Sequence, residues 1–200
     1  VAIELGVIGW LGISNKKDRN RLIDKLLKIT NLSDVRKKYV SGYSGGMKQR
    51  FGIAQLLLNN PQLIIVDEPT AGLDPAERQR FLNVLREVGT NSTVIFSTHI
   101  VDDVKELCND MAILNGGRIL KHIKPEESTK EIKNKIWTKS VSRENLEDAE
   151  KEFNILSSNY NIDNSLSIRL FSDKRPGTGF KHADPQLDDV YLIALKEDQN

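Results

Sequence analysis

A short apolar segment that ends in two acids constrains the fold of this chain more than any other stretch: residues 63–68 read Leu-Ile-Ile-Val-Asp-Glu. Four consecutive apolar residues without alternation are typical of a strand that is buried on both faces of a parallel sheet. In open α/β sheets, ligands bind beyond the carboxyl ends of the strands, which is where Asp67 and Glu68 would emerge. Adjacent residues at a strand end point in different directions, so one acid can hold Mg²⁺ while the other orients and deprotonates a water. The pattern therefore predicts an α/β fold with a reaction site at this strand end.

A second segment predicts a binding site for phosphate. Residues 44–46, Ser-Gly-Gly, precede a run in which apolar residues recur at intervals of four, three and four: Met47, Phe51, Ala54 and Leu58. This spacing predicts a helix with one buried face that begins at the serine and the glycines. A helix N-terminus with free N–H groups and no bulky side chains binds phosphate oxygens, and the serine hydroxyl adds one more donor. The alternative is a helix cap without a ligand.

Four motifs, taken in their order and spacing, resemble the ATP-binding cassette (ABC) ATPase family. They are residues 43–50 (Tyr-Ser-Gly-Gly-Met-Lys-Gln-Arg), 63–68, 69–75 (Pro-Thr-Ala-Gly-Leu-Asp-Pro) and 97–99 (Ser-Thr-His). The resemblance runs from the start of the chain to about residue 125. It implies an α/β fold that is the C-terminal part of a P-loop NTPase, with a helical subdomain that carries the family's signature motif and with a small α+β C-terminal extension.

The resemblance also implies chemical roles for three residues at the ends of strands. Asp67 would hold Mg²⁺ through water, and Glu68 would act as the general base for the water that attacks ATP. His99 follows a strand expected at residues 93–97 and matches the family's switch histidine, which contacts the γ-phosphate. The alternatives are a carboxylate that caps a turn, a surface acid and a structural histidine, respectively.

Other residues are implied to act across a dimer. The signature motif binds the γ-phosphate that the partner subunit holds, and its residues here are Ser44, Gly45, Gly46 and Met47. The commonest family pattern has Leu in place of Tyr43 and Gln in place of Met47. Asp74 precedes Pro75, and it is expected both to cap a helix and to cross the dimer interface as the residue of the family's D-loop.

The sequence lacks the segment with which a P-loop ATPase grips its nucleotide. That segment reads Gly-x-x-x-x-Gly-Lys-Ser/Thr, and no Gly-Lys dipeptide occurs in these 200 residues. Residues 1–48 contain no Gln, so the Gln-bearing loop that the family places before the helical subdomain is absent as well. We interpret this as N-terminal truncation just after that loop. The isolated chain is therefore expected to be inactive, although the intact protein would be an ATPase.

Three parts are expected along the chain. Residues 1–60 form a partial helical subdomain with the signature motif, and residues 61–124 form half of the α/β ATPase core. Residues 125–200 form the α+β extension, in which strands interleave with two helices. The extension resembles those of some bacterial ABC exporter ATPases, and packing or dimer stabilisation is its expected role.

Charge and cysteine content limit the partners and the compartment. Lys+Arg 29 against Asp+Glu 28 gives a net charge of +1, which argues against a general nucleic-acid-binding surface. Residues 16–50 nevertheless hold eleven Lys or Arg and three Asp, which indicates either a solvated helical face or a docking surface for a partner or anionic lipid headgroups. The one cysteine rules out an internal disulfide and favours a reducing compartment. No apolar segment is long enough to cross a bilayer.

The resemblance leads to an expected function. The chain would belong to the ATP-binding, ATP-hydrolysing subunit of an ABC transporter, with ATP and Mg²⁺ bound between two ATPase subunits of a homo- or heterodimer. An integral membrane permease is the expected partner, powered from the cytoplasmic face of the membrane, and the style of the motifs favours an exporter. Two rival hypotheses stay open: an ABC ATPase outside transport, and a non-catalytic chain that lends only the signature motif in trans. No nucleic-acid partner is expected.

Overall fold

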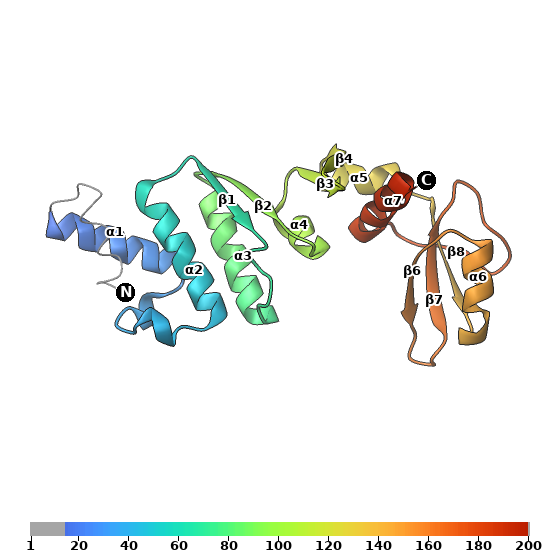
Figure 1. Ribbon diagram of the computed structural model, residues 1–200, viewed down its shortest axis with the longest axis horizontal. Coiled ribbons are helices and arrows are strands. Elements are labelled where there is room, and N and C mark those ends of the chain that lie inside the picture. Colours follow the sequence, from blue (N-terminus) through green and yellow to red (C-terminus); the bar gives the residue numbers. More distant parts are fainter. Residues whose placement is uncertain (1–14, 200) are drawn as a thin grey trace. The chain divides into compact units, whose positions relative to one another are not determined.

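The structure is a computed structural model that describes residues 15–199, apart from the side chain of Asn59. The chain forms two compact units that divide between Leu107 and Cys108 (Figure 1). The expected functional division at residues 1–60, 61–124 and 125–200 stays a prediction, and its first fourteen residues lie outside the described part. Among the described residues, every helix falls short of the length and apolarity that a membrane span requires.

The first unit begins with helices that pack around an apolar cluster. In chain order they are α1 (Lys16–Ile29), the 3₁₀ turns η2 (Ser33–Val35) and η3 (Val40–Gly42), α2 (Gly45–Leu56) and the 3₁₀ turn η4 (Leu57–Asn59). The cluster consists of Ile23, Leu27, Leu32, Tyr43 and Phe51. The rings of Tyr43 and Phe51 meet edge to face, with centroids 6.2 Å apart. The helix predicted after Ser44 is confirmed, and its apolar residues fill the interior because they recur at helical spacing.

A βαβ unit follows these helices. Its elements are β1 (Leu63–Asp67), α3 (Pro75–Gly89), β2 (Thr93–Ser97) and α4 (Val101–Leu107). The two strands pair in parallel, with Leu63 opposite Thr93 and Asp67 opposite Ser97. One face of this sheet packs on α2 and α3 through a second cluster: Ile53, Ile64, Phe81, Val84, Leu85 and Val88. The parallel pairing brings both carboxyl ends to the same edge, as the α/β prediction requires.

The burial predicted for β1 is only half right. Ile64 is 3% exposed, whereas its neighbour Ile65 is 68% exposed. Leu63 on β1 and Ile95 on β2 are exposed as well. Successive side chains of a strand point to opposite faces, and in the described residues helices cover only one face of this two-stranded sheet. The expectation of burial on both faces is therefore wrong for the described structure.

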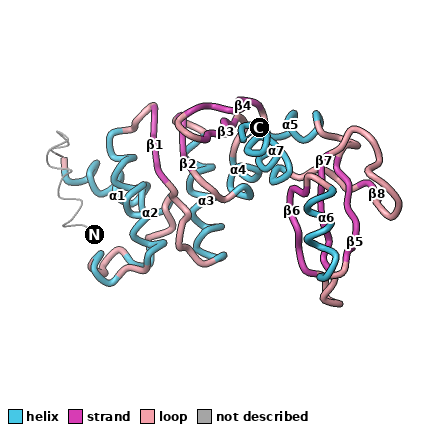
Figure 2. Tube along the Cα trace, turned by 45° about the vertical axis from the view of Figure 1, so that its right-hand side comes forward, coloured by secondary structure: helices cyan, strands magenta, loops and turns pink. Residues whose placement is uncertain are grey.

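The second unit is a hairpin followed by an α+β domain. Its elements are β3 (Met111–Asn115), β4 (Arg118–Ile123), α5 (Pro125–Glu131), β5 (Ile136–Val141), the 3₁₀ turn η5 (Arg143–Asn145), α6 (Leu146–Glu152), β6 (Ile155–Tyr160), β7 (Leu166–Phe171), β8 (Lys181–His182) and α7 (Leu187–Gln199). The four-stranded antiparallel sheet has the order β6-β7-β5-β8. Ala149 of α6 packs on this sheet against Trp137, Ile168 and Leu170, and Figure 2 shows the helix beside the strands.

The α+β extension predicted from the sequence is confirmed, and one of its helices was missed. The missed helix, α5, has Pro125 at its first turn and is only seven residues long. Such a short helix offers no apolar period to read. The last helix, α7, is tied to the sheet through its first turn, because Asp189 is buried and lies 2.7 Å from a guanidinium nitrogen of Arg169 on β7.

Candidate functional site

Two residues that follow neighbouring strands meet at the carboxyl edge of the β1–β2 sheet. Glu68 comes directly after β1, and His99 comes two residues after β2. Nδ1 of His99 lies 2.8 Å from a carboxylate oxygen of Glu68. The His99 side chain is 71% exposed and that of Glu68 is 37% exposed, so both are open to a ligand. The structure thus brings together two of the residues that the motifs singled out.

Asp67 is held at the same edge by Ser97. The hydroxyl of Ser97 donates a hydrogen bond to Oδ1 of Asp67. The backbone N–H of Glu68 lies 3.2 Å from that hydroxyl and 3.1 Å from the carbonyl oxygen of Ser97. Sequence reasoning gave Ser97 no role of its own, and its place as the first residue of the Ser-Thr-His motif was the only signal. Ser97 orients one acid and anchors the backbone of the other.

Glu68 has an unusual backbone conformation. Its φ is +44°, in the left-handed region that costs an L-residue about 1–2 kcal/mol. Two hydrogen bonds from its N–H to Ser97 hold it there. Ala71 donates its N–H to the carbonyl oxygen of Glu68 at 3.1 Å, so the chain turns sharply after the strand. Strained residues of this kind cluster at functional sites, which agrees with the position of Glu68.

The donor set around Asp67 suits Mg²⁺ rather than a metal held by protein alone. Among residues 15–199, no group of three or more His, Cys, Asp or Glu is arranged to hold a metal ion. Mg²⁺ usually keeps several waters and binds one or two carboxylates together with substrate phosphates. Asp67 is an exposed carboxylate at a strand end, so it fits such a site when a nucleotide supplies the remaining oxygens.

The Ser-Gly-Gly segment starts α2 as predicted. Ser44 is the N-cap, and its side-chain oxygen accepts a hydrogen bond from the N–H of Met47 at 3.2 Å. The Met47 side chain is half-buried and packs on the Ile23 cluster. The role of Met47 in binding a nucleotide stays a prediction. Gly46 is buried against Glu77, since a Cβ at Gly46 would lie 3.0 Å from the Cβ of Glu77.

Asp74 caps α3, which confirms the local half of its prediction. Its Oδ1 accepts a hydrogen bond from the N–H of Glu77 at 2.8 Å, and Pro75 occupies the first turn of the helix. A carboxylate at this position also interacts favourably with the positive end of the helix dipole. The role of Asp74 in a dimer interface stays a prediction.

Ion pairs with buried residues of α2 and α4 link α3 to both neighbouring helices. Glu77 forms an ion pair with Arg50 of α2, which is 3% exposed. Arg78 donates from Nε to Asp103 of α4 at 2.7 Å, and Asp103 also accepts a hydrogen bond from the hydroxyl of Thr70. Sequence reasoning missed these contacts, because nothing in a single sequence marks a charged residue on an amphipathic helix as buried.

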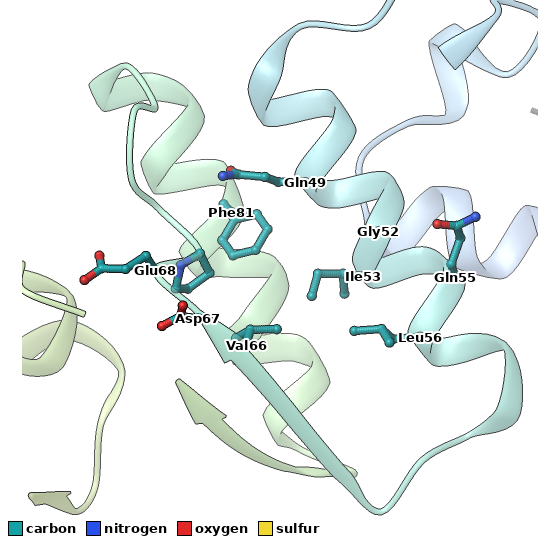
Figure 3. A pocket seen from close by; sticks show the side chains of 10 residues that line it. Gln49, Gly52, Ile53, Gln55, Leu56, Val66, Asp67, Glu68 and Phe81 are labelled. Carbon is teal, nitrogen blue, oxygen red and sulfur yellow. The ribbon is translucent and has the colours of Figure 1, made fainter. Parts of the chain in front are cut away.

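A cleft of about 510 Å³ lies between α2 and the end of β1. Figure 3 shows Asp67, Glu68 and Val66 along one side and the residues of α2 along the other, with Phe81 between them. Gln49 lines this cleft, and its side-chain oxygen is buried without a hydrogen-bond partner among the described residues. Asp67 and Glu68 thus line one end of this cleft, although the Glu68 side chain extends away from α2 (Figure 3).

Known proteins resemble this chain in sequence and in fold. A family model described as "ABC transporter" matches residues 6–71. The structure of CbiO1 from Clostridium perfringens, described as part of the ABC transporter complex CbiONQ, superposes with a TM-score of 0.55 at 31% identity, over 62% of this chain and 50% of that chain. This chain belongs to the ABC ATPase family. The prediction from the four motifs is thereby confirmed, and so is the predicted P-loop NTPase fold class.

Two curated relatives of this chain also carry names that refer to transport. An uncharacterised ABC transporter ATP-binding protein, YxlF of Bacillus subtilis, is 37% identical over 136 residues, which is 68% of this chain and 45% of the relative. The methionine import ATP-binding protein MetN of Photobacterium profundum is 40% identical over 111 residues, which is 54% of this chain and 32% of the relative. The chain spans less than half the length of these relatives.

Proposed function

We propose that this chain is part of the ATP-hydrolysing subunit of an ABC transporter and that it powers a separate membrane permease from the cytoplasmic face. The observation that carries the proposal is the 2.8 Å contact between Glu68 and His99 beside Asp67. A carboxylate within reach of an imidazole, at the strand end where ligands bind, suits the activation of a water next to a phosphate. The names of the relatives support a transporter context.

Each residue at the strand ends has one task in this proposal. Glu68 accepts a proton from the water that attacks the γ-phosphate. His99 holds Glu68 in place through Nδ1, and its other ring nitrogen faces the γ-phosphate, to which it donates when both ring nitrogens carry a proton. Asp67, oriented by Ser97, would hold Mg²⁺ through water. When bound, the ion would offset the charge that develops on the phosphate oxygens.

A second ATPase subunit would complete the site. Ser44, Gly45 and Gly46 stand at the start of α2, whose first N–H groups lack partners within the helix. We infer that they bind the γ-phosphate of an ATP held by the other subunit of a homo- or heterodimer. Asp74 would lie at the same interface. In the cap the Ser44 oxygen accepts a hydrogen bond from the N–H of Met47, and the hydroxyl would donate its own proton to the phosphate.

The direction of transport is not assigned. The motifs favoured an exporter, but MetN is named as an import protein, and the description of CbiO1 and its complex names no exporter. The exporter expectation therefore has no support. The residues at the proposed site act on ATP, and the permease sets which way the substrate moves.

The test is ATP hydrolysis by the product of the complete reading frame that contains these residues. We expect Glu68→Gln to lower kcat by about 10²- to 10⁴-fold, the usual contribution of a general base, while ATP binding persists. Asp102→Asn is the matched control, because Asp102 is an exposed acid on α4, and it should hydrolyse ATP at the wild-type rate. Wild-type turnover by Glu68→Gln would overturn the proposal.

Two outcomes would favour the rival hypotheses. ATP-dependent association of a wild-type protein that never hydrolyses ATP would indicate a non-catalytic chain that lends only its signature motif. Hydrolysis that purified permease-containing membranes leave unchanged would indicate an ABC ATPase outside transport. Both measurements use the same purified protein, so they separate the catalytic claim from the transport claim.

A further inference from the structure

Asp103 is a fully buried carboxylate that the proposed chemistry does not use. It lies in α4, four residues after His99, and its side chain is 0% exposed. A charge withdrawn from water is costly unless it is paired and hydrogen-bonded. The burial of Asp103 in a seven-residue helix beside the proposed reaction site therefore requires a structural explanation.

Both carboxylate oxygens of Asp103 accept hydrogen bonds. The donors lie in the loop after β1 and in the first turn of α3. Oδ2 accepts a hydrogen bond from the hydroxyl of Thr70, which is 2% exposed and stands two residues after Glu68. Oδ1 accepts from Nε of Arg78 at 2.7 Å, and Arg78 stands four residues after Asp74. One carboxylate thus joins the loop after β1, the first turn of α3 and the helix after His99.

The backbone carries this link to His99 within a single turn. The N–H of Asp103 donates to the carbonyl oxygen of Ile100 at 3.0 Å, and the N–H of Ile100 donates to the hydroxyl of Thr98 at 3.0 Å. Glu68 is connected to Thr70 by a tight loop in which Ala71 bonds back to Glu68. Glu68 is therefore connected to His99 through Asp103 by a few hydrogen bonds and by short stretches of backbone.

We propose that Asp103 is a positioning residue: it ties the Glu68 loop to the helix that follows His99 and so keeps the Glu68 carboxylate in contact with the His99 ring. Its importance for hydrolysis rests on the proposed function, but the contact itself does not. Because charge-assisted hydrogen bonds strengthen where water is excluded, the loop and α4 are held as one body. Without Asp103 the exposed ends of both segments separate.

The histidine rings report on this contact directly. The chain has three histidines, and neither His122 nor His182 lies in the first unit, so both serve as internal references. We would record ¹H–¹³C spectra of the ring protons in the full 200-residue chain without nucleotide. Glu68→Gln removes the charge from the contact and defines how far the His99 signal moves when the contact is altered.

Two pairs of variants test the link. Asp103→Asn and Thr70→Val should move the His99 signal by at least half of the displacement that Glu68→Gln causes. Asp102→Asn, at an exposed neighbouring position, and Thr70→Ser, which keeps the hydroxyl, should leave the signal at its wild-type position. Signals of His122 and His182 should not move in any variant. Thr70→Val keeps the Asp103–Arg78 pair, so it carries the test if Asp103→Asn fails to fold.

An unmoved His99 signal in a folded Thr70→Val chain would overturn the inference, even if its melting temperature fell, because a purely structural role lowers stability without altering this contact. Because no nucleotide is present, that result would leave the proposed function untouched. Conversely, a moved signal in this chain, together with a product of the complete reading frame that does not hydrolyse ATP, would support the positioning role and argue against the proposed function.

Discussion

Glu77 and Arg78 are neighbours in the first turn of α3, yet they bind opposite elements. Glu77 pairs with Arg50 on α2, and Arg78 pairs with Asp103 on α4. Figure 1 shows α3 between these two helices. Asp74 caps the same turn. The first turn of α3 therefore connects the signature helix, the loop after Glu68 and the helix after His99, and four of the predictions below probe this turn or the strand beside it.

Two arginines pair with Glu77, and replacing the buried one, Arg50, should lower the stability of the chain far more than replacing the exposed one, Arg80. The Arg50 side chain is 4% exposed and that of Arg80 is 53% exposed, and both pair with Glu77. We expect Arg50→Met to lower the free energy of unfolding by about 3 kcal/mol, because it leaves a largely buried carboxylate short of a partner. Arg80→Met should cost about 0.5 kcal/mol. Urea titrations of both variants measure the difference, and equal losses would contradict it.

Two adjacent glycines should respond differently to alanine. A Cβ at Gly46 would press on Glu77, whereas a Cβ at Gly45 meets nothing within 4 Å. Gly46→Ala should therefore destabilise the chain by about 1–3 kcal/mol through overpacking. Gly45→Ala should stay within about 0.5 kcal/mol of wild type. Thermal unfolding followed by circular dichroism compares them, and a Gly46→Ala variant as stable as Gly45→Ala would show that Glu77 moves aside freely.

Asp74 should be replaceable by asparagine but not by alanine in the isolated chain. Its carboxylate caps α3 through the N–H of Glu77, and asparagine caps helices about as well as aspartate. We expect Asp74→Ala to cost about 1 kcal/mol of unfolding free energy and Asp74→Asn only a few tenths. Chemical denaturation is the measurement. Equal stability of all three forms would mean that the cap does not support the helix.

The uneven burial of β1 predicts opposite outcomes at neighbouring isoleucines. Ile64 is 3% exposed and Ile65 is 68% exposed. Ile64→Ala should cost about 2–5 kcal/mol, because it leaves a cavity against α3. Ile65→Ala should change the unfolding free energy by about 0.5 kcal/mol or less. If both substitutions prove equally costly in this chain, something in it covers the open face of the sheet.

The 200-residue chain by itself should not hydrolyse ATP. Its sequence contains no Gly-Lys dipeptide and so no P-loop, and a P-loop's backbone N–H groups and Lys supply much of the charge stabilisation in phosphoryl transfer. Phosphate release by the purified chain should equal that of its Glu68→Gln variant. Release by the wild-type chain above that variant would refute this expectation.

Local patterns were sufficient for the motifs, for the end of β1 and for the starts of α2 and α3. Residues 63–68 predicted a strand that ends in two acids, and the Asp-Pro pair at 74–75 predicted a capped helix start. These predictions hold because strand and helix termini depend on the preferences of a few consecutive residues. The family resemblance likewise depended on short segments, and each of them can be recognised in the sequence without knowledge of the fold.

What the sequence by itself determined was therefore the identity of the family, the helix starts at Ser44 and Asp74, and the strand edge at which Asp67, Glu68 and His99 gather. Only the tertiary structure decided that Ile65 is exposed beside buried Ile64, that Met47 packs inward, and that Asp103 is buried between Thr70 and Arg78. The physical reason is that burial and ion pairing depend on which elements cover one another. The two hydrogen bonds of Asp103, for example, join residues that are 33 and 25 positions apart in the sequence. No local sequence pattern predicts such pairs.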